Sequence, residues 1–133
     1  ACLTNMDSLN PAMTRASTII CPTSTSSGGD QVIAVGVKDI DDLKNQTVYG
    51  LSKSVSEYAF RRGLEKSGKN PADYKFEHLD PGPAATALQS GSDKVKAICV
   101  WNPFALTVTT QNKAAKVIYS SDLIKGEILD CIV

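Results

Sequence analysis

Short apolar runs rich in β-branched residues recur along the chain, separated by polar, glycine-rich or amphipathic stretches. Runs of this length and composition predict β-strands. The pattern predicts strands over residues 17–21, 31–35, 47–51, 74–78, 95–101, 115–119 and 127–133. Pro22 is expected to stop the first of these strands. The eight residues that follow it, 23–30, are polar or glycine and therefore predict a loop.

Helical periodicity fills the spaces between the later strands. From Ser54 to Ser67 apolar or small residues recur at three- and four-residue steps, and Gly68 and Pro71 then end the helix. We expect further helices over 84–90 and 104–110, a helical turn over 39–43, and a capping acid at Asp80. Because strands and helices alternate, the sequence predicts an α/β fold with three layers and a mainly parallel sheet. Ligands of such sheets bind beyond the carboxyl ends of strands.

Composition narrows the function classes. The chain has 133 residues, enough for one substantial core, and 14 basic residues balance 14 acidic ones. This balance gives no reason to expect nucleic acid or an anionic membrane as a partner. The sequence contains no apolar run long enough to cross a bilayer. It begins at Ala1 with a strand-like segment, which suggests a piece of a longer protein.

The four cysteines, Cys2, Cys21, Cys99 and Cys131, all stand beside apolar residues. We interpret them as small buried side chains, although a disulfide remains open because spacing alone does not identify spatial neighbours. No C-x-x-C pair occurs, so we expect no metal site, and nothing in the sequence calls for a cofactor.

The start of the 54–67 helix is the first candidate site. Ser54-Val-Ser-Glu57 fits a capping box, in which the serine oxygen accepts from the N–H three residues on and the glutamate bonds back. The same end could also hold a small polar or anionic solute through backbone N–H groups and the hydroxyls of Ser54 and Ser56. The spacing around Lys53 is not that of a P-loop.

Two further segments carry candidate ligand contacts. Trp101 and Asn102 end the most apolar strand with a stacking surface and an amide, although a core tryptophan and a helix cap explain them equally well. Asn5 and Asp7 follow the first strand-like segment and are open to the same two interpretations. Catalytic residues are scarce, because the single histidine, His78, lies inside a predicted strand. We expect no enzyme.

Several segments together resemble the solute-binding proteins of ABC importers in the nitrate, sulfonate, taurine and bicarbonate group. The segments, in order, are 4–10, 42–44, 54–58, 100–103, 120–121 and 126–130. The subgroup associated with urea carboxylase is the most similar. The resemblance implies a type II periplasmic-binding fold, in which two α/β lobes close over a solute, together with an extracytoplasmic location and a membrane permease as partner.

On this resemblance, Asn5 and Asp7 would come from the first lobe, Ser54 and Ser56 from the second, and Trp101-Asn102 would lie across the cleft. Members of the family are about twice as long, so residues 1–36 would be a remnant of the first lobe and hinge. Residues 37–133 would form the second lobe and the returning hinge strand.

Two other interpretations stay open. Relatives of this fold include pyrimidine-precursor synthases, although the sequence has no cysteine cluster or histidine pair suited to that chemistry. Alternatively, a free-standing chain would assemble into a homo-oligomer that covers the surface left by the missing lobe. The solute itself is not identified, and Asp7 would decide its charge, because a carboxylate facing the ligand disfavours an anion.

Overall fold

The computed structural model describes residues 3–5 and 18–132. The strands are β1 (Leu3–Asn5), β2 (Cys21–Thr25), β3 (Asp30–Val35), β4 (Thr47–Gly50), β5 (Lys75–His78), β6 (Ala97–Trp101), β7 (Ala115–Ser120) and β8 (Leu129–Ile132). The helices are α1 (Val55–Lys66), α2 (Pro81–Gln89) and α3 (Phe104–Gln111), with short 3-10 turns η2 (Asp41–Asn45), η3 (Pro71–Asp73) and η4 (Ser121–Ile124). None of the helices in this part of the chain has the length and apolar character needed to cross a membrane.

A five-stranded sheet with the order β5-β4-β6-β3-β7 forms the centre of the larger lobe. Strands β5 and β6 both run parallel to β4, whereas β3 is antiparallel to both of its neighbours, β6 and β7. The sheet is therefore mainly parallel with one reversed strand. The reversal places the first residue of β3, Asp30, opposite Trp101 at the end of β6.

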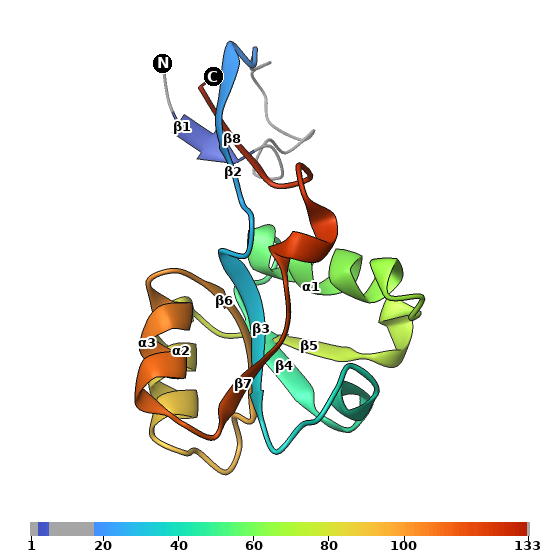
Figure 1. Cartoon of the computed structure of the whole chain (residues 1–133), viewed down its shortest axis with the longest axis vertical. Helices are drawn as coiled ribbons and strands as arrows, with labels where there is room; N and C mark the ends of the chain where they lie inside the picture. The colour runs from blue at the N-terminus through green and yellow to red at the C-terminus, as the bar shows by residue number, and fades with distance from the viewer. Residues whose placement is uncertain (1–2, 6–17, 133) are drawn as a thin grey trace.

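Helices cover both faces of this sheet, so the lobe has three layers (Figure 1). On the face of α1, Val32 and Cys99 pack with the helix residues Phe60 and Leu64. On the opposite face, Ile98 packs with residues of α2 and α3. Neighbouring residues of β3 and β6 thus point to opposite cores, which explains why both strands are continuous apolar runs. The predicted α/β fold with three layers is confirmed.

A second, smaller sheet with the order β1-β8-β2 lies at one end of the molecule, next to both chain termini (Figure 1). Strand β8 is its centre and pairs antiparallel with β1 and β2. Chain segments that enter and leave the larger lobe therefore run side by side here.

The strand predicted over 17–21 was wrong over residues 18–20, which form no strand, and the loop predicted over 23–30 is observed only over residues 26–29. Strand β2 begins at Cys21 and continues through Pro22 to Thr25. It lies at the edge of the small sheet, where a proline without an N–H is tolerated, and a register shift occurs between Pro22 and Ser24. The hydroxyl of Thr23 donates to the carbonyl of Asp130 in β8, so polar side chains add to the pairing.

The cysteines follow the prediction only in part. Cys99 and Cys131 are buried, as expected, but Cys21 is exposed because it lies on the edge strand β2. These three residues carry thiols rather than disulfides. Cys2 lies outside the described residues.

Candidate functional site

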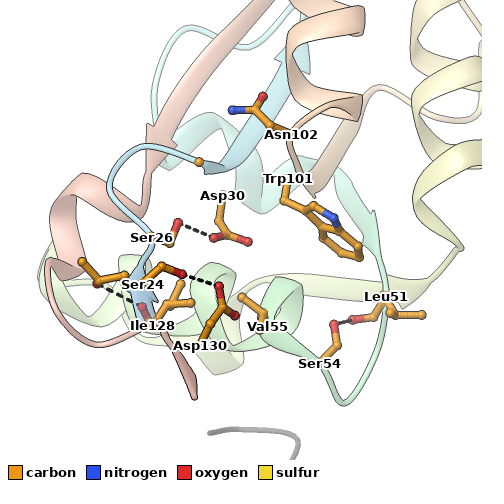
Figure 2. A pocket seen from close by; sticks show the side chains of 12 residues that line it. Ser24, Ser26, Asp30, Leu51, Ser54, Val55, Trp101, Asn102, Ile128 and Asp130 are labelled. Carbon is orange, nitrogen blue, oxygen red and sulfur yellow. Dashed lines mark hydrogen bonds between the residues drawn. The ribbon is translucent and has the colours of Figure 1, made fainter. Parts of the chain in front are cut away.

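A pocket of about 580 Å³ lies where the small sheet meets the larger lobe. Its walls come from both parts, as Figure 2 shows: β2 and β8 on one side, and the ends of β4 and β6 and the start of α1 on the other. The lining residues are Ser24, Thr25, Ser26, Gly29, Asp30, Leu51, Ser54, Val55, Trp101, Asn102, Ile128 and Asp130. The carboxyl ends of two parallel strands and the small sheet therefore line one cavity.

Ser54 lines this pocket and caps α1, but its hydrogen bonds differ from the predicted capping box. Its Oγ accepts from the N–H of Ser56 at 3.2 Å and donates to the carbonyl of Leu51 at 2.7 Å. The carboxylate of Glu57 accepts from the N–H of Lys53 at 2.9 Å instead of the N–H of Ser54. Lys53 has a φ of 55°, and this left-handed turn presents its N–H to the glutamate.

Ser56 does not line the pocket. It is fully buried, and its hydroxyl has no hydrogen-bond partner in the structure. Its carbonyl accepts from the thiol of Cys99 at 3.2 Å, and burial raises the pKa of that thiol well above its usual range. Ser56 therefore lies within the core between α1 and β6.

Trp101 and Asn102 both line the pocket. The indole of Trp101 is partly buried and meets the ring of Phe104 edge to face, with 6.1 Å between centroids and 86° between planes. This contact fixes the indole at the pocket wall, while the exposed amide of Asn102 lies at the rim. The carboxyl end of the third parallel strand, β5, which Leu79 follows, contributes no lining residue.

The two candidate residues from the first segment differ in what the structure shows. Asn5 is the last residue of β1 and pairs in register with Asp130 of β8, a residue that lines the pocket. Asp7 lies outside the described residues.

Two carboxylates that line the pocket, Asp30 and Asp130, were not predicted from the sequence. Asp30 is only 6% exposed and accepts a hydrogen bond from the hydroxyl of Ser26 at 2.5 Å. Asp130 accepts from the hydroxyl of Ser24 at 2.6 Å. Figure 2 shows both pairs facing the same space as Trp101. The first pair joins the loop after β2 to the start of β3, and the second joins β2 to β8.

A serine network joins the loop after β2 to the start of η4. The hydroxyls of Ser26 and Ser121 are 2.8 Å apart, and the N–H of Asp30 donates to Ser121 at 3.4 Å. Ser121 is buried and begins η4, directly after β7. The two chain segments that connect the small sheet to the larger lobe therefore contact each other at this network.

His78 is not one of the residues that line this pocket. Its Nδ1 accepts from the N–H of Ser52 at 3.3 Å, and its Nε2 is 3.8 Å from Asp80. Asp80 precedes α2 as expected, but its side chain makes no capping hydrogen bond. Over residues 3–5 and 18–132, no three His, Cys, Asp or Glu side chains gather in a way that could hold a metal ion.

No protein-family model matches the chain, and neither does any curated protein. Among solved structures, the chain is similar to the periplasmic aliphatic sulphonate-binding protein SsuA from Escherichia coli, with a TM-score of 0.66 and 23% identity over 79% of this chain and 36% of that one. It is also similar to a putative sulfonate ABC transporter protein, SsuA from Methylobacillus flagellatus, with a TM-score of 0.65 and 22% identity over 85% and 34% of the two chains.

The alkanesulfonate-binding protein SsuA from Xanthomonas axonopodis, solved with bound MOPS, gives a TM-score of 0.61 and 19% identity over 80% and 38% of the chains. The chain thus has the fold of one lobe of a periplasmic binding protein. It spans little more than a third of the length of these neighbours.

Proposed function

We propose that this chain is the solute-binding component of an ABC importer and holds a small polar molecule without changing it chemically. The observation that carries the proposal is the position of the pocket, which is lined by β2 and β8 of the small sheet and by the larger lobe. A solute held there touches the two parts whose relative movement would open or close a cleft. The likeness to periplasmic sulphonate-binding proteins supports the same role.

We also propose a division of the chain into a first-lobe remnant with the hinge and a second lobe with the returning hinge strand. The sequence places the boundary at residue 36. Strand β3 precedes that boundary, yet it pairs with β6 and β7 inside the five-stranded sheet. We therefore assign β3 to the second lobe, and β1, β2 and β8 to the hinge.

Three finer parts of the proposal follow from the resemblance in the sequence. The partner would be a membrane permease, the location would be extracytoplasmic, and the nearest subgroup would be the one associated with urea carboxylase. Of the candidate contacts, we keep Ser54, Trp101 and Asn102 as pocket residues and Asn5 and Asp7 as residues of the facing side. We assign Ser56 to the core, because it is fully buried.

Isothermal calorimetry tests the proposal with nitrate, taurine, bicarbonate, urea and guanidinium as separate titrants. We expect saturable heat from at least one of them, and we expect Asn102→Ala at the pocket rim to weaken that binding. Asn70→Ala is the matched control, because Asn70 caps η3 away from the pocket. No heat from any titrant would count against a solute-binding role.

A further inference from the structure

The carboxylate of Glu127 gathers three side chains from one face of α1. It accepts hydrogen bonds from Nε of Arg62 at 2.7 Å and from a second guanidinium nitrogen at 3.3 Å. The hydroxyl of Tyr58 donates to it at 2.9 Å, and the ammonium group of Lys66 lies 3.3 Å away. Tyr58, Arg62 and Lys66 are spaced four residues apart, so they share one face of the helix. Glu127 belongs to the turn before β8, and these contacts therefore join that turn to α1.

This cluster differs from an isolated ion pair on the surface. An exposed pair contributes little, because water screens the charges and the side chains lose freedom. Here the guanidinium of Arg62 contacts both carboxylate oxygens, a geometry that is stronger and better defined than a single contact. Only 25% of the Glu127 side chain and 34% of the Arg62 side chain are exposed. We therefore expect the cluster to restrain the turn against the helix.

The residue after Glu127 connects this turn to the wall of the pocket. Ile128 lines the pocket and belongs to the same buried cluster as Phe60 of α1. Its carbonyl accepts from the N–H of Ser26 at 3.0 Å and from the hydroxyl of Thr25 at 3.0 Å. Thr25 and Ser26 line the pocket as well. A restraint on Glu127 thus acts, one residue further on, on the wall that the small sheet and its following loop supply.

Helix α1 supplies the opposite wall. Ser54 caps the helix and Val55 begins it, and both line the pocket. None of Tyr58, Arg62, Lys66 and Glu127 is among the described residues that line the pocket. The cluster therefore links the two walls from outside the cavity.

We propose that Glu127 is a positioning residue of the pocket, which clamps the small-sheet wall against α1 through Tyr58, Arg62 and Lys66. The inference rests on the proposed function, because a solute held in the pocket contacts both walls. An intact clamp keeps the walls at the spacing that a solute needs, so less ordering remains to be done on binding. Without the clamp the small-sheet wall separates from α1 more often, and Trp101 in the same cavity meets more solvent.

The first test needs no solute. Trp101 is the single tryptophan of the chain, so acrylamide quenching of its fluorescence reports the opening of the pocket. Hydrogen exchange, read by mass spectrometry of peptides, reports the bond from the N–H of Ser26 to Ile128. For Glu127→Gln we expect quenching to rise at least about two-fold. Exchange at Ser26 should become about ten-fold faster relative to β6, because a hydrogen bond to a charged group is lost. A merely structural role would speed both peptides by the same factor.

Two further variants locate the effect. Tyr58→Phe removes one hydrogen bond to Glu127 and is expected to change both readouts in the same direction by a smaller factor. Glu65→Gln is the matched control, because Glu65 pairs with the same Arg62 at 2.8 Å but lies within α1. This control removes a carboxylate from the guanidinium without removing a contact between the two walls, so neither readout should change.

The second test uses solute. Calorimetry with nitrate, taurine, bicarbonate, urea and guanidinium compares the unaltered chain with the variants. For each titrant that binds, we expect Glu127→Gln to weaken affinity by about five-fold, because the competent spacing of the walls is populated less. Glu65→Gln should bind like the unaltered chain.

The outcomes separate the two proposals. Quenching and relative exchange in Glu127→Gln that equal those of Glu65→Gln would overturn the inference, whichever titrants bind. Unchanged affinity in Glu127→Gln for a titrant that binds the unaltered chain would overturn it too. If no titrant binds, the proposed function falls, and quenching and exchange still decide whether Glu127 holds the walls together.

Discussion

The contact between Gly63 and Tyr119 sets how closely α1 lies against the sheet, and it can be tested by adding one methyl group. Gly63 is buried in α1, and a Cβ at this position would be 2.3 Å from Cε2 of Tyr119 and 2.8 Å from its Cδ2. Such distances do not occur between real atoms, so the ring or the helix must move. The same helix carries Ser54 and Val55 at its start, so a shift of α1 would also move a wall of the pocket.

Gly63→Ala has opposing effects on stability. Alanine in place of glycine inside a helix gains about 1 kcal/mol from intrinsic propensity. Overpacking a buried ring costs about 2 kcal/mol. The hydroxyl of Tyr119 donates to the carbonyl of Phe60 at 2.6 Å, so swinging the ring away loses about 1 kcal/mol more. We therefore expect Gly63→Ala to destabilise the fold by about 2 kcal/mol, although propensity alone predicts stabilisation.

Urea unfolding of a double-mutant cycle measures this effect. In a Tyr119→Leu background the clash is absent, so Gly63→Ala should become neutral or stabilising by up to about 1 kcal/mol. Whether Gly63→Ala stabilises or destabilises the fold thus depends on the ring of Tyr119. A Gly63→Ala chain at least as stable as the unaltered one, or the same cost in both backgrounds, would refute the close approach of α1 to β7.

Three further predictions concern single side chains. Ser54→Ala should cost about 1 kcal/mol of unfolding free energy because it removes the cap of α1, whereas Ser56→Ala should be neutral or stabilising because it removes a buried hydroxyl without a partner. Urea unfolding compares the two, and a larger loss for Ser56→Ala would contradict the assignment. Hydrogen bonding to Arg62 lowers the pKa of Glu127 from its usual 4.5 to about 2. The ionised carboxylate therefore stabilises the fold fully above pH 4.5, and this contribution is lost as the pH falls towards 2. Glu127→Gln should therefore lower the urea midpoint near neutral pH, and the difference should vanish near pH 2; a constant difference would argue against the ion pair. The thiol of Cys99 is buried, with a raised pKa, so maleimide should label it only in urea, as mass spectrometry of the peptides would show.

Much of the larger lobe could be predicted because its strands and helices have strong local signals. The predicted helix over 54–67 and the observed α1, Val55–Lys66, differ by one residue at each end. The strand over 95–101 was recognised from its apolar run, and residues 97–101 form β6, which is buried on both faces of the sheet. In these segments burial and local preference agree, so pattern alone was sufficient.

Strand β2 could not be predicted in this way, because its stability comes from pairing rather than from burial. All five of its residues are exposed, and it contains a proline. Its partner β8 lies more than one hundred positions away in the sequence, as the bond between Thr23 and Asp130 shows. A pattern of apolar positions carries no information about such a partner, so a polar strand looks like a loop.

The same limitation explains why Asp30 and Asp130 were missed at the pocket. The sequence interpretation searched after the carboxyl ends of strands, which is where parallel strands present their ligand-binding residues. Asp30 stands at the amino end of β3, and only the reversal of that strand brings it opposite Trp101. Asp130 reaches the pocket because β8 lies between β1 and β2 in the small sheet. One reversed strand and one returning strand thus place two carboxylates at the pocket. Their position follows from strand direction and strand pairing, which hydrophobic periodicity does not encode.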